Sequence, residues 1–180
     1  MTAKSDRRKI TRHERRLATE LGGRKTFASG AGDEKGDGRV AQRYMLIGDV
    51  PSPTVRYPLR IESKVTSKSA YTMSSADWDK LVIASVRAGE HPLFHIRITV
   101  PGIGPVELAL ITSDLAAMLG VHVARPWDRT KAAKSYQISW ARWSSGYGAA
   151  AIELQGGRGT LPDQLVLMDY LDFKNLMKDA

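Results

Sequence analysis

Glu62 and Lys64 have the residue types and the spacing that could do chemistry. They lie in the segment RIESKVT, whose two-residue alternation is typical of a β-strand. In such a strand, residues 60, 62, 64 and 66 share one face, and residues 57, 59, 61, 63 and 65 share the other. A carboxylate and an ammonium on one face form either a solvated ion pair of little consequence or part of a metal site.

The Glu62 triplet is one of three acid-x-lysine triplets in the chain, at 33–35, 62–64 and 172–174. The triplet at 172–174 falls in a predicted helix, where residues two apart point in different directions. The triplet at 33–35 falls in the glycine-rich loop FASGAGDEKGDGR, where no helix or strand fixes the relative directions of its side chains. Only Glu62 and Lys64 combine a strand, a shared face and an upstream acid, Asp37, at the start of the preceding strand.

Asp37 is predicted to reach Glu62 and Lys64 through a hairpin. The segments 39–50 and 55–66 have the pattern of two strands joined by the turn PSPT, and they should pair antiparallel. If the turn is centred near Pro51, Asp37 lies opposite the neighbourhood of Lys64. The carboxylates of Asp37 and Glu62, with a main-chain oxygen near Ser63, are the hard donors that Mg²⁺ prefers. Lys64 would then orient a metal-bound water or neutralise charge that develops in the reaction.

Glu14 is the fourth candidate for a site. Residues 10–21 have helical periodicity, with an apolar stripe that includes Leu17 and Leu21 and a Gly-Gly stop. Glu14 falls in the middle of this stripe, where burial of a charged side chain is unfavourable unless the charge is paired or binds a metal. It either pairs with a basic neighbour on the helix or holds a second metal or a water.

With these residues in place, the chain resembles the PD-(D/E)xK nuclease superfamily, specifically its archaeal and phage Holliday junction resolvase-like branch. The resemblance covers about residues 10–120 and rests on HERRLATELGG, SGAGDEKGDGR, LRIESKVTSKSAYTM and RAGEHPLFHIRI. It implies a Mg²⁺ site, in which Mn²⁺ would substitute, made by Glu14, Asp37, Glu62 and Lys64. It also implies a DNA-backbone loop at Ser29-Gly30 and a homodimer that acts on branched DNA. The chain departs from the family where Asp37 follows glycine instead of proline, and where the interval from Asp37 to Glu62 is unusually long.

Four residues are candidates for contact with DNA: Ser29, Gly30, Lys35 and Lys68. Lys68 follows the triplet and could bind a phosphate, although a solvated loop explains it equally well. Ser29 is also common in glycine-rich turns for backbone reasons alone. In addition, His95 and Arg97 share the polar face of LFHIRITV, which could face DNA.

The resemblance implies an α/β fold, a restriction-endonuclease-like mixed central β-sheet flanked by helices, with extra C-terminal strands and a helix. A helix is expected after Ser74, which opens a capping box, with a buried stripe of Trp78, Leu81, Val82 and Val86. Strands are expected in LFHIRITV, VELALIT, SYQISWARW, AAAIELQ and DQLVLMD, with a short helix from residue 113 and a terminal helix at about 170–178. We expect a basic flexible tail at 1–9, a nuclease core at 10–120 and a β-rich extension at 121–180 packed on the core.

Composition limits the classes of function. The chain has 180 residues, with 27 Lys and Arg against 19 Asp and Glu, and the net charge of +8 favours anionic partners such as nucleic acid. No apolar run approaches the roughly 20 residues of a membrane-spanning helix, and no apolar region follows the basic N-terminus as in a secretory signal. Without cysteine there is no disulfide framework, thiol nucleophile or Cys-ligated zinc. We therefore expect no membrane partner and a cytoplasmic location, in a bacterium or a phage-infected host.

Three functions remain open at this stage. The first is a Mg²⁺-dependent DNA endonuclease that cleaves branched DNA, such as a Holliday junction, by in-line attack of a water. The second is a nuclease of the same superfamily that acts on ends, flaps or duplex DNA in recombination or repair. The third is a basic DNA-binding protein without catalysis, whose binding would depend steeply on salt. The set of two acids and a lysine favours a nuclease, because a pure binder gains nothing from carboxylates that face phosphates.

Overall fold

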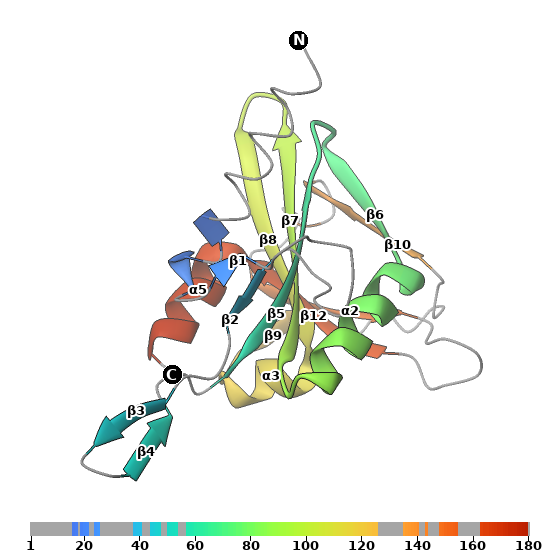
Figure 1. The fold of residues 1–180 in the computed structure, drawn as a ribbon. Coiled ribbons are helices and arrows are strands. Elements are labelled where there is room, and N and C mark those ends of the chain that lie inside the picture. Colours follow the sequence, from blue (N-terminus) through green and yellow to red (C-terminus); the bar gives the residue numbers. More distant parts are fainter. Residues whose placement is uncertain are drawn as a thin grey trace, which may run out of the picture.

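The strand predicted around Glu62 is β5 (Leu59–Val65), which belongs to an eight-stranded mixed sheet. The computed structural model describes residues 16–17, 19–21, 24–25, 38–40, 44–47, 50–53, 57–125, 135–140, 143, 148–154 and 163–179. The strands follow the order β1-β2-β5-β7-β8-β12-β11-β9 across the sheet (Figure 1). The pairs β5–β7 and β9–β11 are parallel, and the other pairs are antiparallel. The predicted α/β class with a mixed sheet and flanking helices is confirmed.

The remaining elements have the following bounds. The other strands of the sheet are β1 (Arg24–Lys25), β2 (Gly38–Val40), β7 (His91–Val100), β8 (Gly104–Thr112), β9 (Val123–Arg125), β11 (Ala149–Leu154) and β12 (Asp163–Asp169). Two separate pairs are β3 (Tyr44–Ile47) with β4 (Val50–Pro53), and β6 (Ala70–Ser74) with β10 (Ser135–Ser139). The helices are α2 (Ser75–Arg87), α3 (Ser113–Met118) and α5 (Tyr170–Asp179). No helix in these described parts is long and apolar enough to cross a membrane.

β5 pairs antiparallel with β2, as predicted, but the connection and the register differ from the prediction. The segment predicted as a turn forms β4, which pairs with β3 in a small hairpin of its own. Pro51 and Pro53 are tolerated there because each strand of a two-stranded sheet is an edge strand. Gly38 pairs with Ile61, whereas a turn centred near Pro51 would have brought it opposite Ser63 or its neighbour.

The predicted N-terminal helix is described at residues 16, 17, 19 and 20, which are helical, and at Leu21. Leu17 is buried in the core and Leu21 packs against it, which confirms this part of the predicted apolar stripe. The helical segment is therefore held to the sheet by its apolar side.

α2 and β6 form the crossover that the parallel strands β5 and β7 require. Ser74 Oγ accepts a hydrogen bond from the main-chain N–H of Asp77 at 3.2 Å and donates to its Oδ2 at 2.8 Å, which confirms the predicted cap. Leu81 is buried as predicted, but Val86 is 72% exposed. At 100° per residue, Ser85 lies nearer the centre of the buried stripe than Val86 does, and Ser85 is the residue that is buried.

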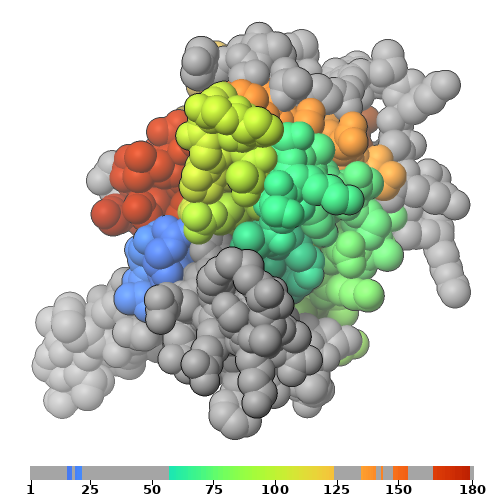
Figure 2. All heavy atoms as spheres, turned by 90° about the horizontal axis from the view of Figure 1, so that it is seen from above, coloured from blue at the N-terminus to red at the C-terminus, as the bar shows by residue number. Residues whose placement is uncertain are grey.

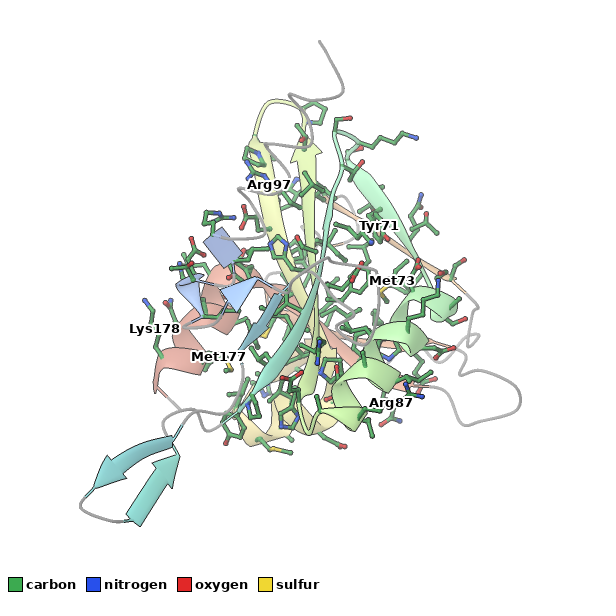
Figure 3. The ribbon with its side chains drawn as sticks, viewed as in Figure 1. Tyr71, Met73, Arg87, Arg97, Met177 and Lys178 are labelled. Atoms are coloured by element: carbon green, nitrogen blue, oxygen red, sulfur yellow. The ribbon has the colours of Figure 1, made fainter. Side chains whose placement is uncertain are left out.

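Different elements cover the two faces of the central strands. On one face, the ring of Tyr170 in α5 meets the ring of His95 in β7 edge-on, with 4.8 Å between the ring centres. On the other face, Tyr71 in β6 packs against Phe94 in β7, with 6.0 Å between the ring centres. Figure 3 shows Tyr71 and Met73 between β6 and the central strands, where Met73 is fully buried. Side chains that alternate along β5 and β7 therefore enter two distinct environments.

Candidate active site

Glu62 and Lys64 lie side by side on one face of β5, as the alternation predicted. Lys64 Nζ is 2.5 Å from Glu62 Oε1, and the two side chains are 37% and 23% exposed, in that order. Their cross-strand partners in β7 are Phe94 and Ile96, which are fully buried. The ion pair thus has apolar neighbours on the sheet and is itself half-buried.

This site lies where β5 leaves the core. The first three residues of β5 are buried, the next three are half-buried and Val65 is exposed. At the buried end, Arg60 Nε donates a hydrogen bond to Glu90 Oε2 at 2.8 Å, and these side chains are 4% and 2% exposed. Arg60, Glu62 and Lys64 share one face and form a polar row from the core to the solvent. Only the outer end of this row is accessible to a substrate.

Five of the predicted site residues, Glu14, Ser29, Gly30, Lys35 and Asp37, lie outside the described residues. Their roles stay predictions, but two described neighbours bear on them. Gly38, which follows Asp37 in the chain, pairs with Ile61, which precedes Glu62. Arg16, two residues after Glu14, binds Glu107 in β8.

Lys68 is described and lies in the loop between β5 and β6. Its main-chain N–H donates to Thr66 Oγ1 at 3.1 Å, and its carbonyl accepts from the N–H of Thr99 at 3.3 Å. The loop is therefore fixed to the end of β7, while the Lys68 side chain is exposed. The structure thus places an exposed cation near the outer end of β5.

The donor chemistry of the site fits a hard metal ion. Among the described residues there is no group of three or more His, Asp or Glu side chains that could hold a metal. Glu62 and the main-chain oxygen of Ser63 are oxygen donors, and Mg²⁺ is commonly held by one or two carboxylates with waters in the other positions. The described half of the site therefore suits Mg²⁺ and not a soft, sulfur-seeking metal.

A second polar cluster lies on the opposite face of β5, and sequence reasoning missed it. Ser63 Oγ is 3.1 Å from His95 Nδ1, and His95 Nε2 is 3.4 Å from Glu107 Oε2. Arg16 Nη2 binds both carboxylate oxygens of Glu107 at 2.7 Å. The prediction that His95 could face DNA is wrong, because its side chain is 0% exposed. The missed signal was a histidine inside an apolar run of the kind that forms strands buried on both faces.

The charges of this cluster are strongly coupled. Burial by itself would raise the pKa of Glu107, but the hydrogen bonds and charges of His95 and Arg16 lower that pKa to about 2. Burial lowers the pKa of His95, although the hydrogen bond and charge of Glu107 oppose the shift. Burial and the nearby Glu20 raise the pKa of Tyr170, whose hydroxyl donates to Glu20 Oε2 at 3.4 Å.

A cleft of about 400 Å³ opens beside this cluster, lined among others by Arg16, Glu20, Glu107, Trp140 and Lys174. Figure 2 shows residues 16–17 and 19–21 in blue against the yellow-green β7–β8 hairpin and the red α5. Arg16 and Lys174 in the cleft each face the carboxylate of Glu20, at 3.0 and 3.9 Å. The cleft therefore has little uncompensated positive charge for a phosphate, in contrast to the outer end of β5.

The fold and the site define a mixed α/β protein with an acid–lysine pair at the exposed end of a central strand. Neither the comparison with protein families nor the comparison with curated proteins finds a match. Among solved structures, the chain is similar to Hjc, a Holliday junction resolvase from the archaeal hyperthermophile Archaeoglobus fulgidus. The identity is 17% and the TM-score 0.42, over 77% of this chain and 89% of that chain. A TM-score below 0.5 at this identity establishes neither a family nor an activity.

Proposed function

We propose that the protein is a Mg²⁺-dependent DNA endonuclease of the PD-(D/E)xK type, which hydrolyses phosphodiester bonds in branched DNA such as a Holliday junction. One observation carries the proposal: Glu62 and Lys64 are paired at the exposed end of β5, and the neighbouring strand β2 starts at Gly38, directly after Asp37. These are the acids and the lysine that the resemblance to the superfamily assigns to the metal site.

The proposed roles follow from the chemistry of each side chain. Asp37 and Glu62 hold Mg²⁺ or Mn²⁺, with the main-chain oxygen of Ser63 as a third donor. When bound, the metal supplies an acidified water and polarises the scissile phosphate. Lys64 already lies 2.5 Å from the Glu62 carboxylate, so its ammonium can orient the attacking water and neutralise developing charge. The water oxygen attacks phosphorus in line as the P–O bond to the leaving oxygen breaks; the water gives its proton to solvent, and the leaving oxygen takes one up from solvent. Glu14 would hold a second metal or a water.

DNA is the proposed partner. The net charge of +8 supports binding to a polyanion, and Lys68 is exposed beside the outer end of β5. Ser29, Gly30 and Lys35 are proposed to contact the DNA backbone with it. A homodimer would present two active sites to the two sides of a four-way junction, in the cytoplasm of a bacterium or a phage-infected host.

Cleavage of a labelled four-way junction and of the matching duplex, with and without Mg²⁺, tests this proposal. We expect metal-dependent cleavage that falls by about 100- to 1,000-fold in Lys64→Met, since one stabilising cation near the transition state is lost. Glu62→Gln should also lose Mn²⁺ binding. Asp172→Asn and Lys80→Met are matched controls, because both side chains are exposed and lie on other elements. Cleavage that persists in a Glu62→Ala, Lys64→Ala double variant would reject the residue assignment.

The same assay separates the alternative functions. A panel of flaps, free ends and duplex, compared at equal concentration with the junction, reports the preferred DNA form. A nuclease that acts on ends or flaps would cleave those forms faster than the junction. Salt-sensitive binding to every form, without metal-dependent turnover, would instead support a non-catalytic DNA-binding protein.

A further inference from the structure

Ser63, the middle residue of the Glu62-Ser63-Lys64 triplet, is held from the face of β5 opposite to the acid–lysine pair. Its hydroxyl lies 3.1 Å from Nδ1 of His95, directly across from it in the parallel pair β5–β7. His95 is 0% exposed and its ring is flanked edge-on by Tyr170 of α5. The side chain that contacts Ser63 is therefore fixed by packing on a rigid strand.

The contacts continue from His95 to the N-terminal helical segment. His95 Nε2 faces Glu107 Oε2 at 3.4 Å, and Arg97 Nη1 lies 3.4 Å from the other oxygen of Glu107. Arg16 binds both oxygens of Glu107 at 2.7 Å, so three cationic or polar groups converge on one carboxylate. Arg97 lies on the upper part of the β7–β8 hairpin in Figure 3. The chain of contacts thus joins β5 to the segment that follows Glu14.

We propose that His95 is a positioning residue for the metal site: by holding Ser63 from behind, it fixes the direction in which Glu62 and Lys64 leave β5. This inference rests on the proposed function, since the site that it positions is the proposed nuclease site. Through Glu107 and Arg16, the same contacts fix the described helical residues 16–17 and 19–20 relative to β5.

The polarity of the position supports a role beyond packing. Neighbouring residues of β7, Leu93, Phe94, Ile96 and Ile98, are apolar and fully buried. The hydrogen bonds of a buried polar side chain add little net stability compared with a pair of apolar residues of similar shape in the places of both partners. A histidine at this place therefore contributes direction more than stability. Residues behind metal ligands characteristically act in this way, by orienting the ligands.

The donor and acceptor roles follow from the chemistry of the partners. In the neutral ring we expect the proton on Nε2, because Nε2 lies 3.4 Å from the carboxylate of Glu107, which can only accept. Nδ1 is then an acceptor and receives the hydroxyl hydrogen of Ser63. This arrangement predicts one tautomer of His95, with the proton on Nε2. Replacement of Glu107 should change the tautomer, and replacement of Ser63 should remove the hydrogen bond at Nδ1.

Two pairs of substitutions in the full chain test the proposal. His95→Phe keeps a planar ring and removes both nitrogens, whereas His95→Asn retains a polar atom near the position of Nδ1. Ser63→Ala removes the hydroxyl, whereas Ser63→Thr retains it. Ile111→Val is the matched control, because Ile111 is fully buried on the same face of the sheet and takes no part in these contacts.

Three measurements are made on each variant: the melting temperature, the Kd for Mn²⁺ by titration with EPR detection, and kcat and KM on the four-way junction. For His95→Phe we expect a KM for DNA within about twofold and a loss of about 10- to 100-fold in both kcat and Mn²⁺ affinity. Its melting temperature should fall, because the Ser63 hydroxyl loses its partner, and should recover in the double variant Ser63→Ala, His95→Phe. His95→Asn and Ser63→Thr should recover most of the loss in kcat and Mn²⁺ affinity. The double variant Ser63→Ala, His95→Phe should be no worse than His95→Phe alone, because the two residues act through one contact.

Nitrogen-15 NMR of the histidine rings supplies a readout that does not depend on activity. We expect the Nε2–H tautomer of His95 in the wild type and a shifted Nδ1 resonance in Ser63→Ala. The other tautomer, or effects on kcat that add independently in the double variant, would overturn the proposal. If the His95→Phe and Ser63→Ala variants cleave DNA as fast as the wild type does, this inference alone is refuted. If the wild type neither cleaves DNA nor binds Mn²⁺, the proposed function is refuted as well.

Discussion

Removal of one partner from the Arg60–Glu90 pair should destabilise the protein more than any substitution of an exposed charge. The pair joins the second residue of β5 to the residue directly before β7, with Nε and Oε2 2.8 Å apart. The side chains are 4% and 2% exposed, so water cannot replace the lost partner. Glu90→Gln keeps the size of the side chain and leaves the charge of Arg60 buried without its carboxylate.

The expected magnitude follows from this burial. Loss of one partner of a buried ion pair costs about 3–5 kcal/mol of unfolding free energy. For a chain of this length, each 1 kcal/mol lowers the melting temperature by about 2–4 °C, so the expected loss is about 6–20 °C. Replacement of both residues, in Arg60→Met with Glu90→Leu, should restore most of the stability, because well-packed apolar residues avoid the desolvation of two charges.

Urea unfolding followed by circular dichroism, together with melting temperatures, measures these differences. Arg87→Met serves as the control, because Arg87 lies in the exposed last turn of α2 and its replacement should change stability by about 0.5 kcal/mol or less. A Glu90→Gln variant that loses less than about 1 kcal/mol would refute the reasoning, since the pair would then be no stronger than a surface ion pair.

Two further predictions concern stability. Glu107, whose pKa is lowered from 4.5 to about 2, stabilises the fold at pH values above 4.5, and this contribution should vanish as the pH falls towards 2. The difference in unfolding free energy between the wild type and Glu107→Gln should therefore shrink between pH 5 and pH 2.5, and a difference that stays constant would contradict this. Ser74→Ala removes the cap of α2 and should cost about 1 kcal/mol in urea unfolding. Ser75→Ala, one residue further along, is its control, and an equal loss in both variants would exclude a capping effect.

The parts of the fold that could be predicted from the sequence depend on local patterns. The alternation of RIESKVT was enough to predict β5 and the shared face of Glu62 and Lys64, because side chains in any strand alternate with a period of two. The cap at Ser74 was equally local, since it depends on residues three apart. Local patterns also predicted the C-terminal strands and the terminal helix, whereas the mixed central sheet was implied by the resemblance to the nuclease superfamily.

The register and the buried cluster could not be predicted in this way. The pairing of Gly38 with Ile61 depends on where the chain turns, and the β3–β4 hairpin moved the turn away from the prolines. The contacts among Arg16, Ser63, His95 and Glu107 join four separate elements, and no periodicity within one element reports on them. The roles of Glu14 and Asp37 stay predictions.

The position of β12 has a consequence for how the chain is made in the cell. β12 lies between β8 and β11, so the last strand in the sequence fills an interior place in the sheet. Until Asp169 has left the ribosome, the free edge of β8 stays exposed, and at about 5–20 residues per second this lasts for seconds. The nascent chain would then carry an open, apolar edge of the kind that chaperones shield. Premature termination before β12 should therefore yield insoluble fragments, not a smaller folded protein.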